Sequence, residues 1–231
     1  MPDTNLHFET VLFDLDGTLI DSIRLILDSF HHTLAAHGKA AASDGELLVH
    51  VGTPLTRHLA HYAEDPAEVE AMIATYRAWN LAHHDGAVRA FPGAVAAVHA
   101  LANRVAQLGV VTSKQRAAAH RGLAVAGFCA DTERLAPFQV LVGADDVALH
   151  KPDPTPLLAA LERLGASRER AAYVGDSPHD LAAARAAGLT AVAVGWGPFP
   201  RAALDQVGYD LWLDTPPALA ALGRAQPARR S

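Results

Sequence analysis

Two acidic residues, Asp14 and Asp16, lie one residue apart directly after the apolar run Thr10–Phe13 and just before Gly17. Residues i and i+2 of a strand project to the same side, so both carboxyl groups could face one point at the end of this run. Carboxylates that lie this close repel each other unless a cation or a proton lies between them. Turn formation before Gly17 is the alternative explanation, and the spacing alone does not decide between the two.

Groups suited to binding an anion follow in two later segments. Thr112 and Ser113 come directly after the apolar run 105–111 and before a helical pattern. Hydroxyl and free backbone amide groups at such a position form an anion site, although they could equally serve only as a helix cap. Lys151, in the segment 150–154 (HKPDP), could neutralise a phosphate group, whereas an isolated surface lysine is usually solvated.

Two more acids suggest a metal ligand set. Asp176 comes just after the apolar run 171–174, and Asp180 lies one helical turn later. Mg²⁺ prefers oxygen ligands and typically takes one or two carboxylates together with water and a substrate oxygen. Asp14 and Asp176 could supply these carboxylates. The alternative is that Asp176 or Ser177 caps the helix that follows.

The elements that must position these residues alternate between strands and helices. Apolar runs typical of buried strands cover residues 10–13, 105–111, 138–142, 171–174 and 191–194. Helical patterns cover residues 93–102, 114–126, 154–164 and 178–187. This alternation predicts an α/β fold with a Rossmann-like parallel sheet flanked by helices. Ligands of such sheets bind outside the carboxyl ends of the strands, where Asp14, Thr112 and Asp176 each fall.

The segment 21–86 interrupts the alternation, because it has apolar residues at helical spacing and no strand pattern. It is therefore predicted to be an all-helical cap domain inserted into a core formed by residues 1–20 and 87–231. Its two ends flank the aspartate motif, which is an arrangement suited to a lid.

The composition limits the class of protein. The 231 residues are 50% hydrophobic and 19% charged, and they carry a formal net charge of −6. This balance argues against a nucleic-acid-binding surface, which needs clustered Lys and Arg. Cys129 is the single cysteine, so an internal disulfide is excluded and a reducing compartment fits. No apolar run approaches the roughly 18 residues of a membrane span, and the first ten residues lack an export pattern, so a cytoplasmic protein without a membrane partner is predicted.

Four motifs in this order resemble the signature motifs of the haloacid dehalogenase-like hydrolases. They are DLDGT (14–18), VTSK (111–114), KPDP (151–154) and GDSPHD (175–180). The insertion after the first motif is similar to that of the subgroup with a helical C1 cap, which includes phosphoglycolate phosphatases, bacterial pyrophosphatases and β-phosphoglucomutases. The resemblance covers about residues 10–215 and is specific for the superfamily rather than for a substrate.

The resemblance implies a role for each motif residue that handles the phosphoryl group. Asp14 would be the nucleophile that forms an aspartyl-phosphate. Asp16 would protonate the leaving oxygen and later activate water. The Thr112 hydroxyl and the Ser113 amide would hold the phosphoryl oxygens, while Lys151 balances their charge. Such a division makes physical sense, because carboxylate attack splits one displacement into two.

The resemblance also implies a Mg²⁺ site and a cap contact. Asp14, the Asp16 carbonyl and Asp176 would bind the ion, Asp180 would orient the metal shell, and Thr18 would orient Asp16. In the cap, the segment 51–59 resembles the part that faces the active site in relatives. Its residue Arg57 is a candidate contact for an anionic substrate, with a plain surface arginine as the alternative.

The predicted function is a Mg²⁺-dependent phosphatase acting on a small phosphorylated metabolite, a phosphoglycolate-like monoester. A β-phosphoglucomutase-like phosphomutase and a pyrophosphatase are the enzymatic alternatives, and Thr18 after the aspartate pair favours a phosphatase over a mutase. A dehalogenase would have no use for Asp16 or Asp176. A phospho-receiver signalling module is the alternative from a different class, but such a module needs no helical lid after its first strand.

Overall fold

The computed structural model describes residues 7–129 and 134–223 of the chain. In this part, six parallel strands form one sheet in the order β5-β4-β1-β6-β7-β8. The strands are β1 (Thr10–Phe13), β4 (Gln107–Val111), β5 (Val140–Val142), β6 (Ala171–Gly175), β7 (Thr190–Val194) and β8 (Leu211–Leu213). The sequence prediction of a parallel α/β sheet is confirmed, while β8 was not expected.

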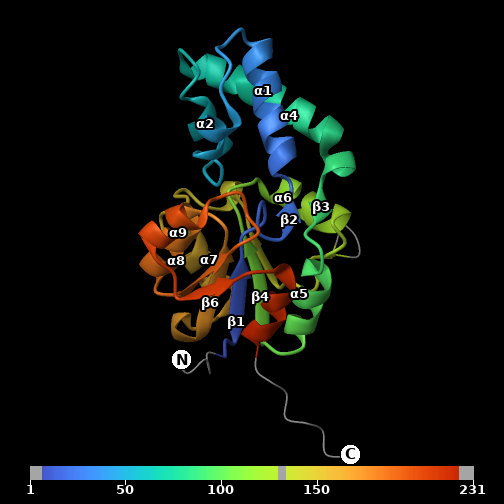
Figure 1. The fold of residues 1–231 in the computed structure, drawn as a ribbon, viewed down its shortest axis with the longest axis vertical. Coiled ribbons are helices and arrows are strands. Elements are labelled where there is room, and N and C mark those ends of the chain that lie inside the picture. Colours follow the sequence, from blue (N-terminus) through green and yellow to red (C-terminus); the bar gives the residue numbers. More distant parts are fainter. Residues whose placement is uncertain (1–6, 130–133, 224–231) are drawn as a thin grey trace, which may run out of the picture.

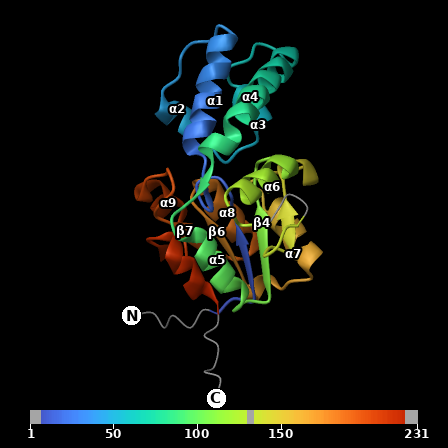
Figure 2. The same cartoon turned by 90° about the vertical axis from the view of Figure 1, so that its right-hand side faces the viewer.

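Helices cover both faces of the sheet (Figures 1 and 2). They are α5 (Ala94–Ala102), α6 (Arg116–Val125), α7 (Thr155–Leu164), α8 (Pro178–Ala187) and α9 (Arg201–Val207), with 3-10 turns η1 (Ala144–Asp146), η2 (Arg168–Arg170) and η3 (Pro216–Leu222). Alternate residues of β1 enter different clusters, because Val11 and Phe13 pack with α5 and α6 while Leu12 packs with α7 and α8. Every residue of β1 is buried, as expected for a central parallel strand.

Local sequence signals explain where the helices begin and end. Helix α8 starts with a capping box, in which Ser177 accepts a hydrogen bond from the Asp180 amide and Asp180 accepts one from the Ser177 amide. It ends at Gly188, which has φ 75° and forms the left-handed cap that glycine tolerates. Among the described residues, no helix is long and apolar enough to cross a membrane.

The insertion contains the helices α1 (Ile23–Ala36), α2 (Asp44–Leu48), α3 (Leu55–Leu59) and α4 (Pro66–Ala87), which lie above the carboxyl ends of the strands (Figure 1). These helices have a hydrophobic cluster of their own, with Phe30, Leu59 and Met72 buried in it. An antiparallel ribbon of β2 (Ile20–Asp21) and β3 (Arg89–Ala90) joins the insertion to the core. The helical insertion agrees with the sequence prediction, whereas the two-residue strands of the ribbon are too short to give a pattern. We propose that residues 21–86 act as a cap domain.

Candidate active site

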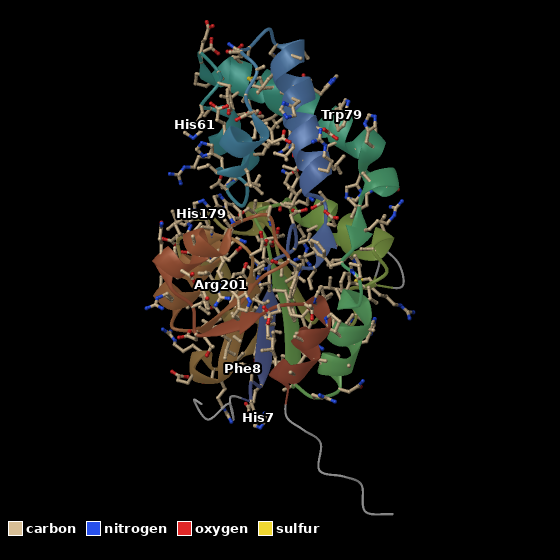
Figure 3. The ribbon with its side chains drawn as sticks, in the orientation of Figure 1. His7, Phe8, His61, Trp79, His179 and Arg201 are labelled. Atoms are coloured by element: carbon tan, nitrogen blue, oxygen red, sulfur yellow. The ribbon has the colours of Figure 1, made fainter. Side chains whose placement is uncertain are left out.

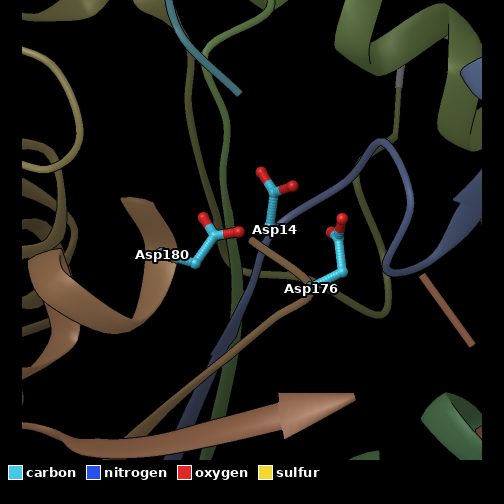
Figure 4. Close-up of side chains that lie close together, drawn as sticks. All are labelled: Asp14, Asp176 and Asp180. Atoms are coloured by element: carbon cyan, nitrogen blue, oxygen red, sulfur yellow. The ribbon is translucent and has the colours of Figure 1, made fainter. Parts of the chain in front are cut away.

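Three of the predicted side chains come together at the carboxyl ends of the central strands. Asp14 follows β1, and Asp176 follows the neighbouring strand β6, while Asp180 lies in the first turn of α8. Each of these carboxyl groups offers one oxygen atom, and the three oxygens lie within 4.8 Å of one another (Figure 4). All three residues are buried. The structure therefore places a compact group of acids where α/β proteins bind ligands.

The glycine of the first motif is required by this close packing. Gly17 has φ 88°, a conformation that side chains rarely adopt. A Cβ atom at this position would lie 2.6 Å from Oδ2 of Asp176. The chain after β1 can therefore pass the Asp176 carboxyl group only with glycine at position 17.

Lys151 is the cation of the acidic group. Its Nζ donates to Oδ1 of Asp14 at 2.7 Å, to Oδ1 of Asp180 at 2.6 Å and to the Tyr173 hydroxyl at 3.0 Å. The Tyr173 hydroxyl in turn donates to the carbonyl oxygen of Val111 at 2.8 Å. Lys151 is only 2% exposed, so this ammonium group depends on its two carboxylate partners for compensation. Tyr173 had no signal in the sequence, because it is one more apolar position of a buried strand.

The acids differ in their pKa values. Burial raises the pKa of Asp14 to about 7, although Lys151 opposes the shift. Burial, followed by the charges of Asp180 and Asp14, raises the pKa of Asp176 well above its ordinary value. Burial also acts to raise the pKa of Asp180, but Lys151 and Ser177 more than offset it, so this pKa lies below the ordinary value. One lysine thus does not compensate three buried carboxylates, and a further cation would complete the site.

The donor set fits Mg²⁺. Its protein atoms are carboxylate oxygens, which are the ligands that this hard cation prefers. Asp14 and Asp176 are the carboxylates that would hold the ion, and the predicted contact of the Asp16 carbonyl with the ion stays a prediction. Asp180 has its Oδ1 on Lys151 and its Oδ2 on Ser177, so its bonds fix the position of Lys151 and of the start of α8.

One predicted contact of the first motif is wrong. Thr18 was expected to orient Asp16, but its hydroxyl donates to Oδ1 of Asp176 at 2.6 Å. The tight turn at Gly17 is the physical reason, because it carries Thr18 back beside the end of β6. Asp16 is held instead by Ser22, whose hydroxyl donates to its Oδ1, and by Lys114, whose Nζ donates to the same oxygen at 2.6 Å. The sequence signal for Lys114 was its place at the end of the VTSK motif.

Thr112 and Ser113 lie beside the acids, in the same cavity as Asp14 and Asp16. Neither residue caps α6, because Gln115 is the N-cap of that helix. The helix thus starts two residues later than predicted. The Thr112 hydroxyl accepts a hydrogen bond from the Lys114 amide at 3.2 Å, and the Ser113 hydroxyl donates to the Gly52 carbonyl of the cap at 2.5 Å. Their role toward phosphate stays a prediction.

Side chains of both parts face the boundary between the cap and the core, where Figure 3 labels His179. His179 of α8 lies on the core side of this boundary, 3.8 Å from the point that a Cβ on Gly52 would occupy. Arg57 is exposed and is not among the residues that line the cavity between the cap and the core. Arg77 of α4 does line this cavity, and it lies outside the segment that the sequence singled out. A substrate contact by Arg57 stays a prediction.

Comparisons with known proteins identify a family and several relatives of this chain. The chain matches the haloacid dehalogenase-like hydrolase family model over residues 11–194. Pyrophosphatase PpaX of Halalkalibacterium halodurans is 38% identical over 191 residues, which are 83% of this chain and 85% of that protein. Pyrophosphatase PpaX of Bacillus cereus is 37% identical over 209 residues, which are 90% of this chain and 93% of that protein. A haloacid dehalogenase-like family protein from Streptococcus pneumoniae shares the fold, with a TM-score of 0.77 at 23% identity over 93% of this chain and 97% of that chain.

Proposed function

Because the chain belongs to the haloacid dehalogenase-like hydrolase family, we propose that this phosphatase is Mg²⁺-dependent and hydrolyses a small phosphate monoester through an aspartyl-phosphate on Asp14. The observation that carries the proposal is the position of Asp14. Its carboxyl group lies at the end of the central strand, opens onto the cavity under the cap and is held by Lys151 at 2.7 Å. No other acid of the buried group lines that cavity among the described residues.

The first step is attack on phosphorus by a carboxylate oxygen of Asp14. Lys151 binds Oδ1, which leaves Oδ2 to form the bond to phosphorus while the bond to the leaving oxygen breaks. Lys151, the Thr112 hydroxyl and the Ser113 amide would stabilise the charge on the phosphoryl oxygens. When bound, Mg²⁺ supplies further positive charge next to Asp14 and the phosphoryl group. Water then hydrolyses the acyl phosphate and regenerates Asp14.

We propose that Asp16 moves the proton in both steps. It lines the same cavity as Asp14, and it is fixed by Ser22, the N-cap of α1, and by Lys114, which lies two residues before α6. We assign it the protonation of the departing alcohol oxygen and then the activation of water. Because Ser22 is the N-cap of α1, the first helix of the insertion, the position of the acid is tied to the position of the insertion.

The Asp16→Asn variant is expected to slow the release of an alkyl alcohol by about 10²–10⁴-fold in the first turnover, which is the usual contribution of a general acid. Nitrophenolate leaves without a proton, so its release from nitrophenyl phosphate in the first turnover should be far less affected. Rapid-quench measurement of both alcohols tests this. Equal losses for the two esters would contradict the acid role of Asp16.

Mg²⁺ at about 100 times its Kd is expected to raise the Tm by about 5–10 °C at pH 8 and by much less at pH 5.5. The reason is competition with protons, because the pKa of Asp14 is raised to about 7 and that of Asp176 is raised as well in the absence of the ion. Calorimetry with and without a chelator measures the increment. Asp176→Asn should abolish it, while Asp205→Asn on the exposed side of α9 should retain it. A rise in Tm with Mg²⁺ that did not depend on pH would contradict a metal site formed by these carboxylates.

Pyrophosphate hydrolysis is a second candidate, because relatives of 37–38% identity carry the name pyrophosphatase PpaX. A phosphoglycolate-like substrate is the one that the cap resemblance favours. Phosphate release from pyrophosphate, phosphoglycolate, sugar phosphates and nucleotides compares these activities directly. A phosphomutase would convert a sugar phosphate without net phosphate release, so the same assay separates it from a phosphatase.

A further inference from the structure

A large cavity remains between the cap and the core although the two parts are in contact. Ser113 of the core donates to the carbonyl oxygen of Gly52 in the cap at 2.5 Å. Arg121 of α6 forms a second link, because its Nε and Nη2 both lie 2.8 Å from the carboxylate of Asp85 on α4. The cavity that these contacts leave has a volume of about 550 Å³ and includes Asp14 in its wall. This volume is in the range of roughly 300–1,000 Å³ that is typical of sites for drug-sized molecules.

Apolar and aromatic side chains contribute much of the cap wall of this cavity, beside polar residues such as Thr53 and Asn80. The apolar and aromatic residues are Ile26, Phe30, Val51, Leu55, Tyr76 and Leu81. On the core side, α6 presents the small side chain of Ala118 to the same space. The ring of His58 lies against Phe30, with 3.9 Å between the ring centroids, and extends the aromatic surface. Such a wall gains free energy by covering an apolar group of the substrate.

The cavity offers little positive charge beyond the reaction centre. Among the described Lys and Arg residues of its lining, Lys114 is paired with Asp16 and Arg121 with Asp85. Arg77 is exposed, so water solvates its guanidinium group. A second anionic group of a substrate would therefore lose water without finding a buried cation to replace it. Pyrophosphate and phosphoglycolate both carry such a group.

The histidines of the lining add no charge at neutral pH. Burial lowers the pKa of His58 to about 3. Burial is also the main cause that lowers the pKa values of His50, His84 and His150. All four rings are therefore neutral at pH 7 and act as part of the aromatic wall.

We propose that the leaving group of the substrate is a bulky, uncharged apolar alcohol that the cap wall covers, so that apolar phosphate monoesters are better substrates than pyrophosphate or phosphoglycolate. This inference rests on the proposed function. In the bound state the phosphoryl group of the substrate contacts Asp14, and the apolar part of its leaving group lies between α1, α4 and α6.

A series of alkyl phosphates tests the proposal. Ethyl, butyl and phenylpropyl phosphate have leaving alcohols of similar basicity, so differences among them report on binding of the apolar body. We expect kcat/KM to rise by at least about tenfold from ethyl to phenylpropyl phosphate, since a few apolar groups in a hydrophobic pocket discriminate by this amount. The kcat/KM for phenylpropyl phosphate should also exceed those for phosphoglycolate and pyrophosphate under the same conditions.

A substitution that fills the cavity gives an independent readout. Ala118→Leu on α6 keeps a good helix former and adds an apolar side chain to the core wall. It should lower the ratio of kcat/KM for phenylpropyl to ethyl phosphate by about tenfold, because the large body no longer fits. Ala74→Leu on α4 is the matched control, since Ala74 is exposed and lies outside the cavity lining. This control should leave the ratio unchanged.

The outcomes separate the inference from the function on which it rests. A flat alkyl series, or a higher kcat/KM for pyrophosphate or phosphoglycolate than for phenylpropyl phosphate, would overturn the apolar substrate class while phosphatase activity stands. An unchanged ratio in Ala118→Leu would also overturn it. Failure to release phosphate from any compound with Mg²⁺ present would instead refute the proposed function itself.

Discussion

The Asp14→Asn variant is expected to lose at least about 10⁴-fold in kcat on every phosphate ester while it remains folded. An amide is a far weaker nucleophile than a carboxylate, so the bond to phosphorus does not form. The substitution keeps the size of the side chain and an oxygen that can accept the hydrogen bond from Lys151. The loss should therefore appear in kcat rather than in the yield of folded protein.

The thermal stability of Asp14→Asn distinguishes loss of the nucleophile from damage to the fold. The pKa of Asp14 is raised from 3.8 to about 7 by burial, so the folded state holds this proton over a range where the unfolded state has released it. Ionised Asp14 therefore destabilises the metal-free protein, by an amount that grows between about pH 4 and about pH 7. Asn does not ionise. The Tm of metal-free Asp14→Asn should thus exceed that of the wild type at pH 8 and approach it near pH 4.

Two measurements complete this test. Labelled phosphate should stay on acid-quenched wild-type protein and be absent from Asp14→Asn. Asp205→Asn is the matched control, because Asp205 is exposed on α9 and its carboxylate contacts Tyr209, so kcat should be unchanged. If Asp14→Asn kept more than a hundredth of the wild-type kcat, the nucleophile would be another group.

Most of the sheet was predictable because its central strands are buried on both faces. The runs that became β1, β4, β6 and β7 consist mostly of apolar residues, which is the pattern of parallel strands covered by helices. β8 is an apolar run of only three residues at the edge of the sheet, which is too short to predict a strand. Its place is set by pairing with β7, a contact between distant segments that no local pattern encodes.

The candidate site likewise contains residues whose position the sequence predicts and contacts that the sequence does not predict. Asp14, Thr112 and Asp176 could be expected to converge, because each directly follows a parallel strand and such strands end at one edge. Contacts that depend on turn shape or on long side chains could not be expected. Thr18 reaches Asp176 through the turn at Gly17, and Lys114 reaches Asp16 across the cavity. The direction of a single turn or the reach of one lysine follows from tertiary structure alone.

The Lys151→Met variant is expected to lose both activity and stability. Removing one partner of a buried ion pair typically costs about 3–5 kcal/mol, because the remaining charges stay buried without compensation. Here two carboxylates lose their cation, since Lys151 lies 2.7 Å from Asp14 and 2.6 Å from Asp180. Loss of a positive charge next to the phosphoryl group should lower kcat by at least about 10²-fold. Urea unfolding at pH 8 and steady-state kinetics measure the two effects.

The pH dependence and a double variant show whether charge is the cause. Lys151 stays protonated throughout, because its two carboxylate partners raise its pKa against the effect of burial. The stability loss of Lys151→Met should therefore be larger at pH 8 than at low pH, where the carboxylates bind protons. Adding Asp180→Asn removes one uncompensated charge and should restore part of the stability but none of the activity.

Lys39→Met, which removes a cap surface ion pair with Glu68, is the matched control and should cost less than about 1 kcal/mol with kcat unchanged. A Lys151→Met protein as stable as the wild type at pH 8, or a double variant that regained activity, would show that Lys151 does not act by balancing these acids.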